Sequence, residues 1–176
     1  MIVRSIPLMI AAITLAICPV TASAANDLYS SAGVQQAKRV IAPAFTLPTM
    51  DGRTIDSTDL RGKVVLINFW ATWCGPCKEE MPAMDRLREA FPATDFALLA
   101  VTADQQQQAI TTFAKGLGLS FPILLDETKD VTVAFGVRGL PTTVIIDRQG
   151  NLVGRAIGPR RWDGPDMIAL LKDLLQ

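Results

Sequence analysis

Two cysteines lie close together in the segment FWATWCGPCKEEMP, residues 69–82. Cys74 and Cys77 follow an apolar run typical of a buried strand and open a helical pattern. Cysteines at i and i+3 at a helix start can close a small disulfide ring, and the positive end of the helix stabilises a thiolate. We therefore predict that Cys74, at the exposed end, is the nucleophile. Cys77, one turn further in, is then the resolving thiol that breaks a mixed disulfide.

Metal binding and a purely structural disulfide explain this pair less well. A structural zinc site needs two more ligands, but the sequence contains no histidine. Its one further cysteine, Cys18, lies in an N-terminal segment that we expect to be removed. A disulfide across so short a loop removes little chain entropy, so it would stabilise the fold poorly. We expect a redox-active pair, no metal and no other cofactor.

Glu80 is expected on the apolar side of the same helix. At 100° per residue, Met84, Leu87 and Phe91 fall within about 40° of Glu80, and Cys77 about 60° away. A buried, unpaired carboxylate relieves its cost by a raised pKa, which suits proton exchange near neutral pH. Glu80 is therefore the candidate acid/base for the thiols. The alternative is a salt-bridged or partly hydrated glutamate, displaced by the helix kink expected at Pro82.

Two positions outside the helix are further candidates. Asn68 is the polar interruption of the buried strand, and it could hydrogen-bond near the site or satisfy a neighbouring backbone group. Pro141 stands at the start of another strand, close to Gly139, where a cis peptide bond is favoured. A cis Leu140–Pro141 bond would leave the Leu140 backbone free to pair with an extended substrate.

Length and composition indicate a single domain without a charged partner. The chain has 176 residues, 49% of them hydrophobic, which suffices for one well-packed core but hardly for two. Lysine plus arginine equals aspartate plus glutamate, 17 against 17. The sequence has no excess of basic residues that would indicate nucleic acid binding. We expect the protein to be a monomer.

The N-terminus predicts export from the cytoplasm. A short positive segment precedes the apolar residues 6–20, and small residues follow at 22–24. We assign residues 1–24 to a signal peptide, 25–41 to a flexible lead-in and 42–176 to the folded domain. The alternative is a retained membrane anchor, although the apolar run is shorter than the roughly 20 residues that span a bilayer. The mature chain is then soluble and periplasmic or otherwise extracytoplasmic.

The elements predict an α/β sandwich with helices on both faces of a mixed sheet. A small hairpin is expected around Asp51-Gly52, and Asp163 is expected to cap the last helix. The predicted strands are 64–69, 96–102, 121–125, 142–146 and 152–157, and the predicted helices are 74–91, 105–115, 131–135 and 163–175.

Over roughly residues 42–176, the chain resembles extracytoplasmic thioredoxin-like proteins of the TlpA/ResA type. The resemblance is carried by these residues: Trp73-Cys74-Gly75-Pro76-Cys77 with Lys78, Glu80-Met81-Pro82, Val137 to Thr143, and Ile146-Asp147 followed by Gly150. It implies a thioredoxin-like three-layer sandwich with an N-terminal β-hairpin and a central insertion within residues 105–126. It also implies that Cys74 and Cys77 are the redox pair, Pro141 the cis proline beside it and Glu80 the active-site glutamate. Asn68 stands where cytoplasmic thioredoxins usually carry a buried aspartate, which shifts the proton role toward Glu80.

The Gly75-Pro76 dipeptide between the cysteines favours a protein-disulfide reductase. This dipeptide is that of reducing thioredoxins, whose reduction potential is about −270 mV, whereas that of the oxidant DsbA is about −120 mV. The difference corresponds to roughly 7 kcal/mol for a two-electron couple. A reductant in an oxidising compartment needs resupply, so a membrane thiol donor of the DsbD or CcdA kind is expected. By resemblance, the substrates are disulfides in apocytochrome c or in copper-site proteins.

Three other functions remain as alternatives. A DsbA-like disulfide oxidase would use the same cysteines at a higher potential. A thiol peroxidase would need Pro and Thr or Ser in the loop before its cysteine, where this chain has Ile67 and Ala71. A Cu(I)-binding chaperone could hold the metal through two thiolates alone.

Overall fold

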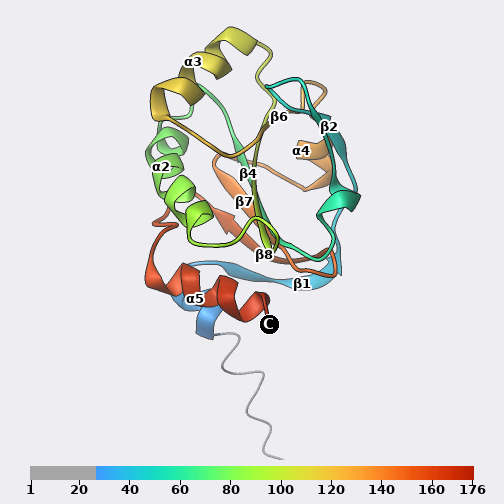
Figure 1. The fold of residues 1–176 in the computed structure, drawn as a ribbon, viewed down its shortest axis with the longest axis vertical. Helices are drawn as coiled ribbons and strands as arrows, with labels where there is room; N and C mark the ends of the chain where they lie inside the picture. Colours follow the sequence, from blue (N-terminus) through green and yellow to red (C-terminus); the bar gives the residue numbers. More distant parts are fainter. Residues whose placement is uncertain (1–26) are drawn as a thin grey trace, which may run out of the picture.

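The computed structural model describes residues 27–176, which fold around one six-stranded sheet (Figure 1). The predicted signal peptide and Cys18 lie outside the described residues. The sheet order is β1-β8-β7-β4-β5-β6, and a separate two-stranded sheet pairs β2 with β3. The strands are β1 (Gln35–Ile41), β2 (Thr46–Pro48), β3 (Thr54–Asp56), β4 (Val64–Trp70), β5 (Phe96–Thr102), β6 (Ile123–Leu125), β7 (Thr142–Ile146) and β8 (Asn151–Ile157). The helices are the 3-10 turn η1 (Ser57–Leu60), α2 (Gly75–Glu89), α3 (Gln107–Leu117), α4 (Asp130–Ala134) and α5 (Pro165–Leu174).

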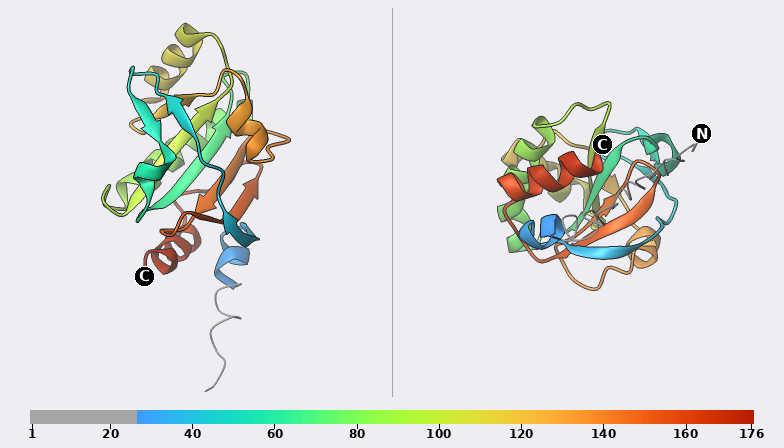
Figure 2. Two further views of the ribbon diagram at one scale, coloured as in Figure 1. Left: turned by 90° about the vertical axis from the view of Figure 1, so that its right-hand side faces the viewer. Right: turned by 90° about the horizontal axis from the view of Figure 1, so that it is seen from below.

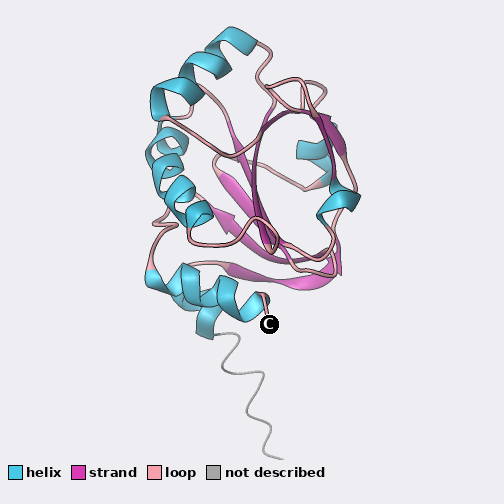
Figure 3. Ribbon diagram, in the orientation of Figure 1, coloured by secondary structure: helices cyan, strands magenta, loops and turns pink. Residues whose placement is uncertain are grey.

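The mixed sheet is the one predicted from the sequence. Strand β4 runs parallel to β5, and β5 parallel to β6, whereas β7 is antiparallel to both β4 and β8. Figure 3 shows these strands as the central layer with helices around it. The predicted hairpin is present as β2 and β3, and segment 105–126 contains α3 and the edge strand β6.

The lead-in to residue 41 was predicted to be flexible, and for its second half this prediction is wrong. Residues Gln35–Ile41 form β1, which pairs antiparallel with β8 at the edge of the main sheet. Six of its seven residues are exposed, so the strand has no alternating apolar pattern to reveal it. Backbone hydrogen bonds to β8, which leave no trace in the order of side chains, hold this strand in place.

Alternate residues of β4 enter two different cores, one on each face of the sheet. All seven residues of this strand are buried. Val64, Leu66 and Trp70 belong to the cluster that also holds the buried residues of α2, α3 and α5. Val65 and Ile67 point the other way, into the cluster that contains α4 and the hairpin. This period of two places Asn68 on the face that α2 covers.

The helices therefore lie on both faces of the sheet, as predicted. Figure 1 shows α2, α3 and α5 together on one side, with α4 and β2 on the other, and Figure 2 shows the same layers from two further directions. The inward stripe of α2 comprises Cys77, Glu80, Met81, Met84 and Leu87. Pro82 lies inside this helix, which continues to Glu89.

Asp163 does not cap the last helix, contrary to the prediction. Helix α5 begins after Gly164 without a side-chain cap, and Pro165 occupies its first turn. The Asp163 carboxylate instead accepts a hydrogen bond from Arg86 Nε of α2 at 2.8 Å. This ion pair with Arg86 joins the segment before α5 to α2.

Within residues 27–176, no helix combines the length and hydropathy that crossing a membrane requires.

Candidate active site

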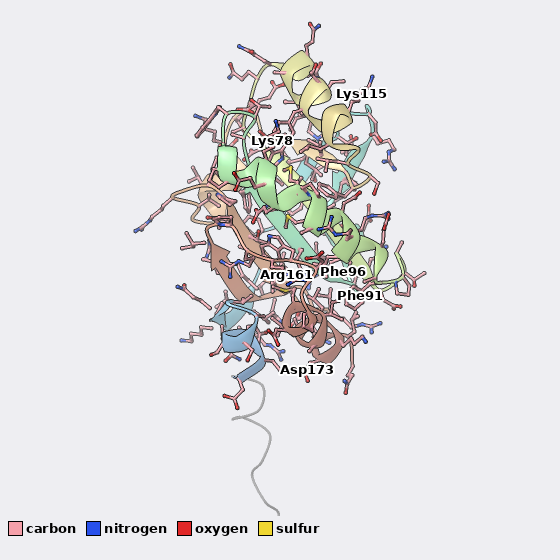
Figure 4. The ribbon with its side chains drawn as sticks, turned by 90° about the vertical axis from the view of Figure 1, so that its left-hand side faces the viewer. Lys78, Phe91, Phe96, Lys115, Arg161 and Asp173 are labelled. Atoms are coloured by element: carbon pink, nitrogen blue, oxygen red, sulfur yellow. A yellow bond between two sulfur atoms is a disulfide. The ribbon has the colours of Figure 1, made fainter. Side chains whose placement is uncertain are left out.

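The two cysteines stand at the N-terminal end of α2, as the sequence predicted. Cys74 is the N-cap residue, and its Sγ accepts a hydrogen bond from the Cys77 backbone N–H at 3.3 Å. A disulfide joins the two residues in this structure, at the end of α2 where Figure 4 labels Lys78. Cys74 keeps 6% of its surface exposed, whereas Cys77 is fully buried. Only Cys74 can therefore meet another protein without movement of the helix.

The loop that leads into the helix is attached to the neighbouring strand. Thr72 donates its backbone N–H to Asp104 Oδ2 at 2.7 Å, just beyond the end of β5. Trp73 is 76% exposed beside this anchor, and Gly75 and Pro76 are exposed in the first turn of the helix. The exposed Trp73 indole and the helix start thus form the rim around Cys74. Asp104 was not among the predicted residues, because nothing in its local sequence links it to a loop 32 residues away.

The Leu140–Pro141 peptide bond is cis in the structure, which confirms the prediction. Strand β7 begins directly after it, and Thr142 pairs with Phe69 of β4. This register brings Pro141 to the end of β4 from which the cysteine loop departs. Half-buried Leu140 and exposed Trp73 line one common groove there.

Glu80 is buried on the sheet side of α2, 3% exposed, as predicted. Its Oε1 accepts from Asn68 Nδ2 at 2.9 Å, and its Oε2 accepts from Trp162 Nε1 at 2.7 Å and from the Arg160 backbone N–H at 3.3 Å. Burial raises the pKa of the Glu80 carboxyl, and the hydrogen bonds from Trp162, Asn68 and Arg160 partly oppose this rise. Among the described residues no cation forms a salt bridge with it. Of the two alternatives that the sequence left open for Glu80, the structure shows the buried carboxyl without a salt bridge, held by hydrogen bonds.

Asn68 is a direct partner of Glu80, so its role is the first of the two that the sequence left open. Its Nδ2 donates to Glu80 and also, at 2.9 Å, to Thr143 Oγ1, which faces it across the β4–β7 pairing. Its Oδ1 is buried and has no partner among residues 27–176.

Trp162 and Arg160 complete the environment of Glu80, and the sequence analysis missed both. Trp162 is fully buried, and the Arg160 guanidinium lies 5.5 Å from the centre of its ring. Arg160 also donates to the Gly33 carbonyl, so the segment before β1 holds this loop in place. A signal was available: Trp162 is one of three tryptophans, and a buried indole N–H needs an acceptor. Sequence alone could not say which acceptor.

The fold and the geometry of this site together define a class of protein. A three-layer sandwich with a mixed sheet, a dithiol pair at a helix start and a cis proline beside it is the thioredoxin-like active site. Within the described residues, no group of three or more His, Cys, Asp and Glu side chains could hold a metal ion. The chemistry of the site is exchange between a dithiol and a disulfide.

Comparison with known proteins identifies the family. The AhpC/TSA family model matches residues 39–155. Thiol-disulfide oxidoreductase ResA of Bacillus thuringiensis (strain Al Hakam) is 38% identical over 117 residues, 66% of this chain and 68% of the relative. Thioredoxin-like protein YneN of Bacillus subtilis (strain 168) is 40% identical over 129 residues, 72% of this chain and 74% of the relative. The crystal structure of a thiol:disulfide interchange protein of the thioredoxin family from Chlorobium tepidum TLS matches with a TM-score of 0.69 and 29% identity, covering 81% of this chain and all of that one.

The chain belongs to the AhpC/TSA family, and within it resembles the ResA proteins, as the motifs around Cys74 had indicated. It is a thiol-disulfide oxidoreductase that acts on protein disulfides.

Proposed function

We propose that this protein reduces disulfides of other proteins outside the cytoplasm, with Cys74 as the attacking thiolate. The unequal burial of the two cysteines carries the choice of the attacking residue, because only Cys74 keeps exposed surface. In the reaction, the Cys74 thiolate attacks a substrate disulfide, forms a mixed disulfide and displaces one substrate thiolate. Cys77 then attacks the Cys74 sulfur and releases the second substrate thiolate, so that the protein leaves with the Cys74–Cys77 disulfide.

Glu80 is proposed as the proton acceptor and donor for the buried thiol. Cys77 must lose its proton to attack, and it lies one helical turn from Glu80, on the same inward stripe. A carboxyl whose pKa is raised by burial exchanges protons closer to neutral pH than an exposed one. Asn68 and Trp162 hold this carboxyl in place, so we regard them as positioning residues.

Pro141, Leu140 and the rim residues are proposed to receive the substrate. The Leu140 backbone lies at the same end of the sheet as Trp73, the residue directly before Cys74. An extended substrate segment that pairs with this backbone would present its disulfide to the Cys74 sulfur. Gly75 and Pro76 keep this side of the helix start free of bulky side chains.

The oxidised protein must be reduced again, and we propose a membrane dithiol donor of the DsbD or CcdA kind for this step. Its two electrons open the Cys74–Cys77 disulfide, and the donor becomes a disulfide. The predicted signal peptide supports an extracytoplasmic site of action, soluble and monomeric after cleavage. Disulfides of apocytochrome c or of copper-site proteins are the proposed substrates, by resemblance to the family.

Two measurements test the direction of transfer. The fully reduced, signal-free protein should cleave insulin disulfides, and its potential against a glutathione buffer should lie near about −270 mV. A value near about −120 mV would instead support the DsbA-like oxidase. Rapid peroxide consumption or tight Cu(I) binding by the reduced protein would support the peroxidase or the chaperone, respectively.

A further inference from the structure

The groove that Trp73 and Leu140 share is also lined by charged side chains, which take no part in the thiol-disulfide exchange itself. Its volume is about 330 Å³, within the range of sites that bind small ligands. Trp73 and Ala71 border it on the side of the cysteine loop, and Gly139 and Leu140 border it on the side of the cis proline. Phe69, Val101 and Val137 also line it. A polypeptide whose disulfide reaches Cys74 would therefore lay its neighbouring residues along an apolar groove.

Three charged side chains stand in this groove, and two of them are cations. They are Lys129, Arg138 and Asp104. The Asp104 carboxylate already accepts the Thr72 backbone N–H at 2.7 Å. Across residues 27–176, neither Lys129 nor Arg138 has a carboxylate oxygen within 4.0 Å. The groove thus has two cations without an anionic partner, on a chain whose overall charge is zero.

The backbone fixes the position of Lys129 at the edge of the groove. Lys129 has φ = 66°, the left-handed conformation that favours glycine, and it is the only described non-glycine residue with positive φ. Its N–H donates to the Asp126 carbonyl at 2.9 Å, and the buried Asp126 carboxylate accepts the N–H groups of Val131 and Thr132. Lys129 thus adopts a conformation that glycine would adopt at lower cost, and such positions are frequent at functional sites.

We propose that Lys129 and Arg138 determine the specificity of this substrate groove, by selecting chain segments that carry aspartate or glutamate next to the substrate cysteine. The apolar lining provides contact area for any segment, and the two cations make binding of an acidic segment more favourable than binding of a basic one. The assignment rests on the proposed reductase function, because it names the substrate class of that same site.

The test uses two synthetic disulfide peptides that differ only in a glutamate or a lysine beside the cysteine. The reduced, full-length protein is freed of reductant, and the second-order rate with each peptide is measured at low and at high ionic strength. Each rate is divided by the rate with hydroxyethyl disulfide, which is small and uncharged. We expect the glutamate peptide to react roughly three- to tenfold faster at low salt, and the ratio to approach one at high salt.

Charge reversal at the groove provides the second arm. Lys129→Glu with Arg138→Glu should invert the preference, whereas Lys115→Glu makes the same kind of change on α3, outside the groove lining, and should leave the ratio unchanged. Equal rates for the two peptides in the wild type, or a preference that survives the double reversal, overturn the groove assignment while normal reduction of hydroxyethyl disulfide leaves the proposed function intact. Failure to reduce any of the three disulfides overturns the proposed function and this assignment with it.

Discussion

The hydrogen bond between Trp162 and Glu80 should control how readily this carboxyl loses its proton. Trp162→Phe keeps a large aromatic ring in the core but removes the Nε1–H that Glu80 Oε2 accepts at 2.7 Å. Because this donor stabilises the ionised carboxylate, its loss should raise the pKa of Glu80 further above its ordinary value. Two other donors, from Asn68 and the Arg160 backbone, remain.

The size of the effect follows from the type of hydrogen bond. A bond to a charged group contributes about 1.5–3 kcal/mol, and one pKa unit corresponds to about 1.4 kcal/mol. A neutral carboxyl gains only about 0.5–1.5 kcal/mol from the same donor, so removing this donor should make ionisation of Glu80 about 1–1.5 kcal/mol less favourable and raise its pKa further. The oxidised protein is the right sample, since its cysteines do not titrate.

Carbon-13 NMR of glutamate labelled at the side-chain carboxyl reads this titration directly. Glu80→Gln assigns the signal, and Trp70→Phe is the matched control. Trp70 is also buried, but its indole N–H has no partner among the described residues. An unchanged Glu80 titration in Trp162→Phe, or an equal shift in Trp70→Phe, would refute the reasoning.

Three further predictions concern the catalytic pair, the pH dependence of stability and β1. Cys77→Ala should accumulate mixed disulfides on Cys74, seen as reductant-sensitive adducts on non-reducing gels, and their absence from a mixture with a good substrate would contradict the assignment of the attacking sulfur. Because the pKa of Glu80 is raised in the folded state, that state binds more protons than the unfolded one, and the free energy of unfolding should fall as pH rises from about 4.5 through the folded pKa. Urea unfolding of Glu80→Gln should lack this part of the decline. Identical pH profiles for the variant and the wild type would contradict a raised pKa of Glu80. Deleting residues up to 41 should lower the free energy of unfolding, because it removes β1 from β8; a truncated protein of unchanged stability would show that β1 contributes nothing.

Much of the central sheet was predictable because its strands carry strong patterns. The bounds of β5 and β7 agree with the prediction, and β4 differs by a single residue. These strands are buried on both faces, so most of their positions are apolar, and the sequence shows each of them as a largely apolar run. Strand β1 escaped because it is an edge strand held by its backbone, and Asp163 was misassigned because a nearby cation competes for its carboxylate.

The residues of the site likewise fall into those that the sequence predicted and those that only the fold brings together. The spacing of Cys74 and Cys77 and the position of Glu80 on the apolar stripe follow from one helix, whose geometry is local and periodic. The sequence by itself therefore determined the dithiol chemistry and the inward carboxyl. The tertiary structure alone decided that Asn68, Trp162 and Arg160 surround that carboxyl, and that Lys129 and Arg138 share a groove with Trp73. These contacts join residues up to 82 positions apart, and they depend on strand register and loop path, which no local pattern of side chains encodes.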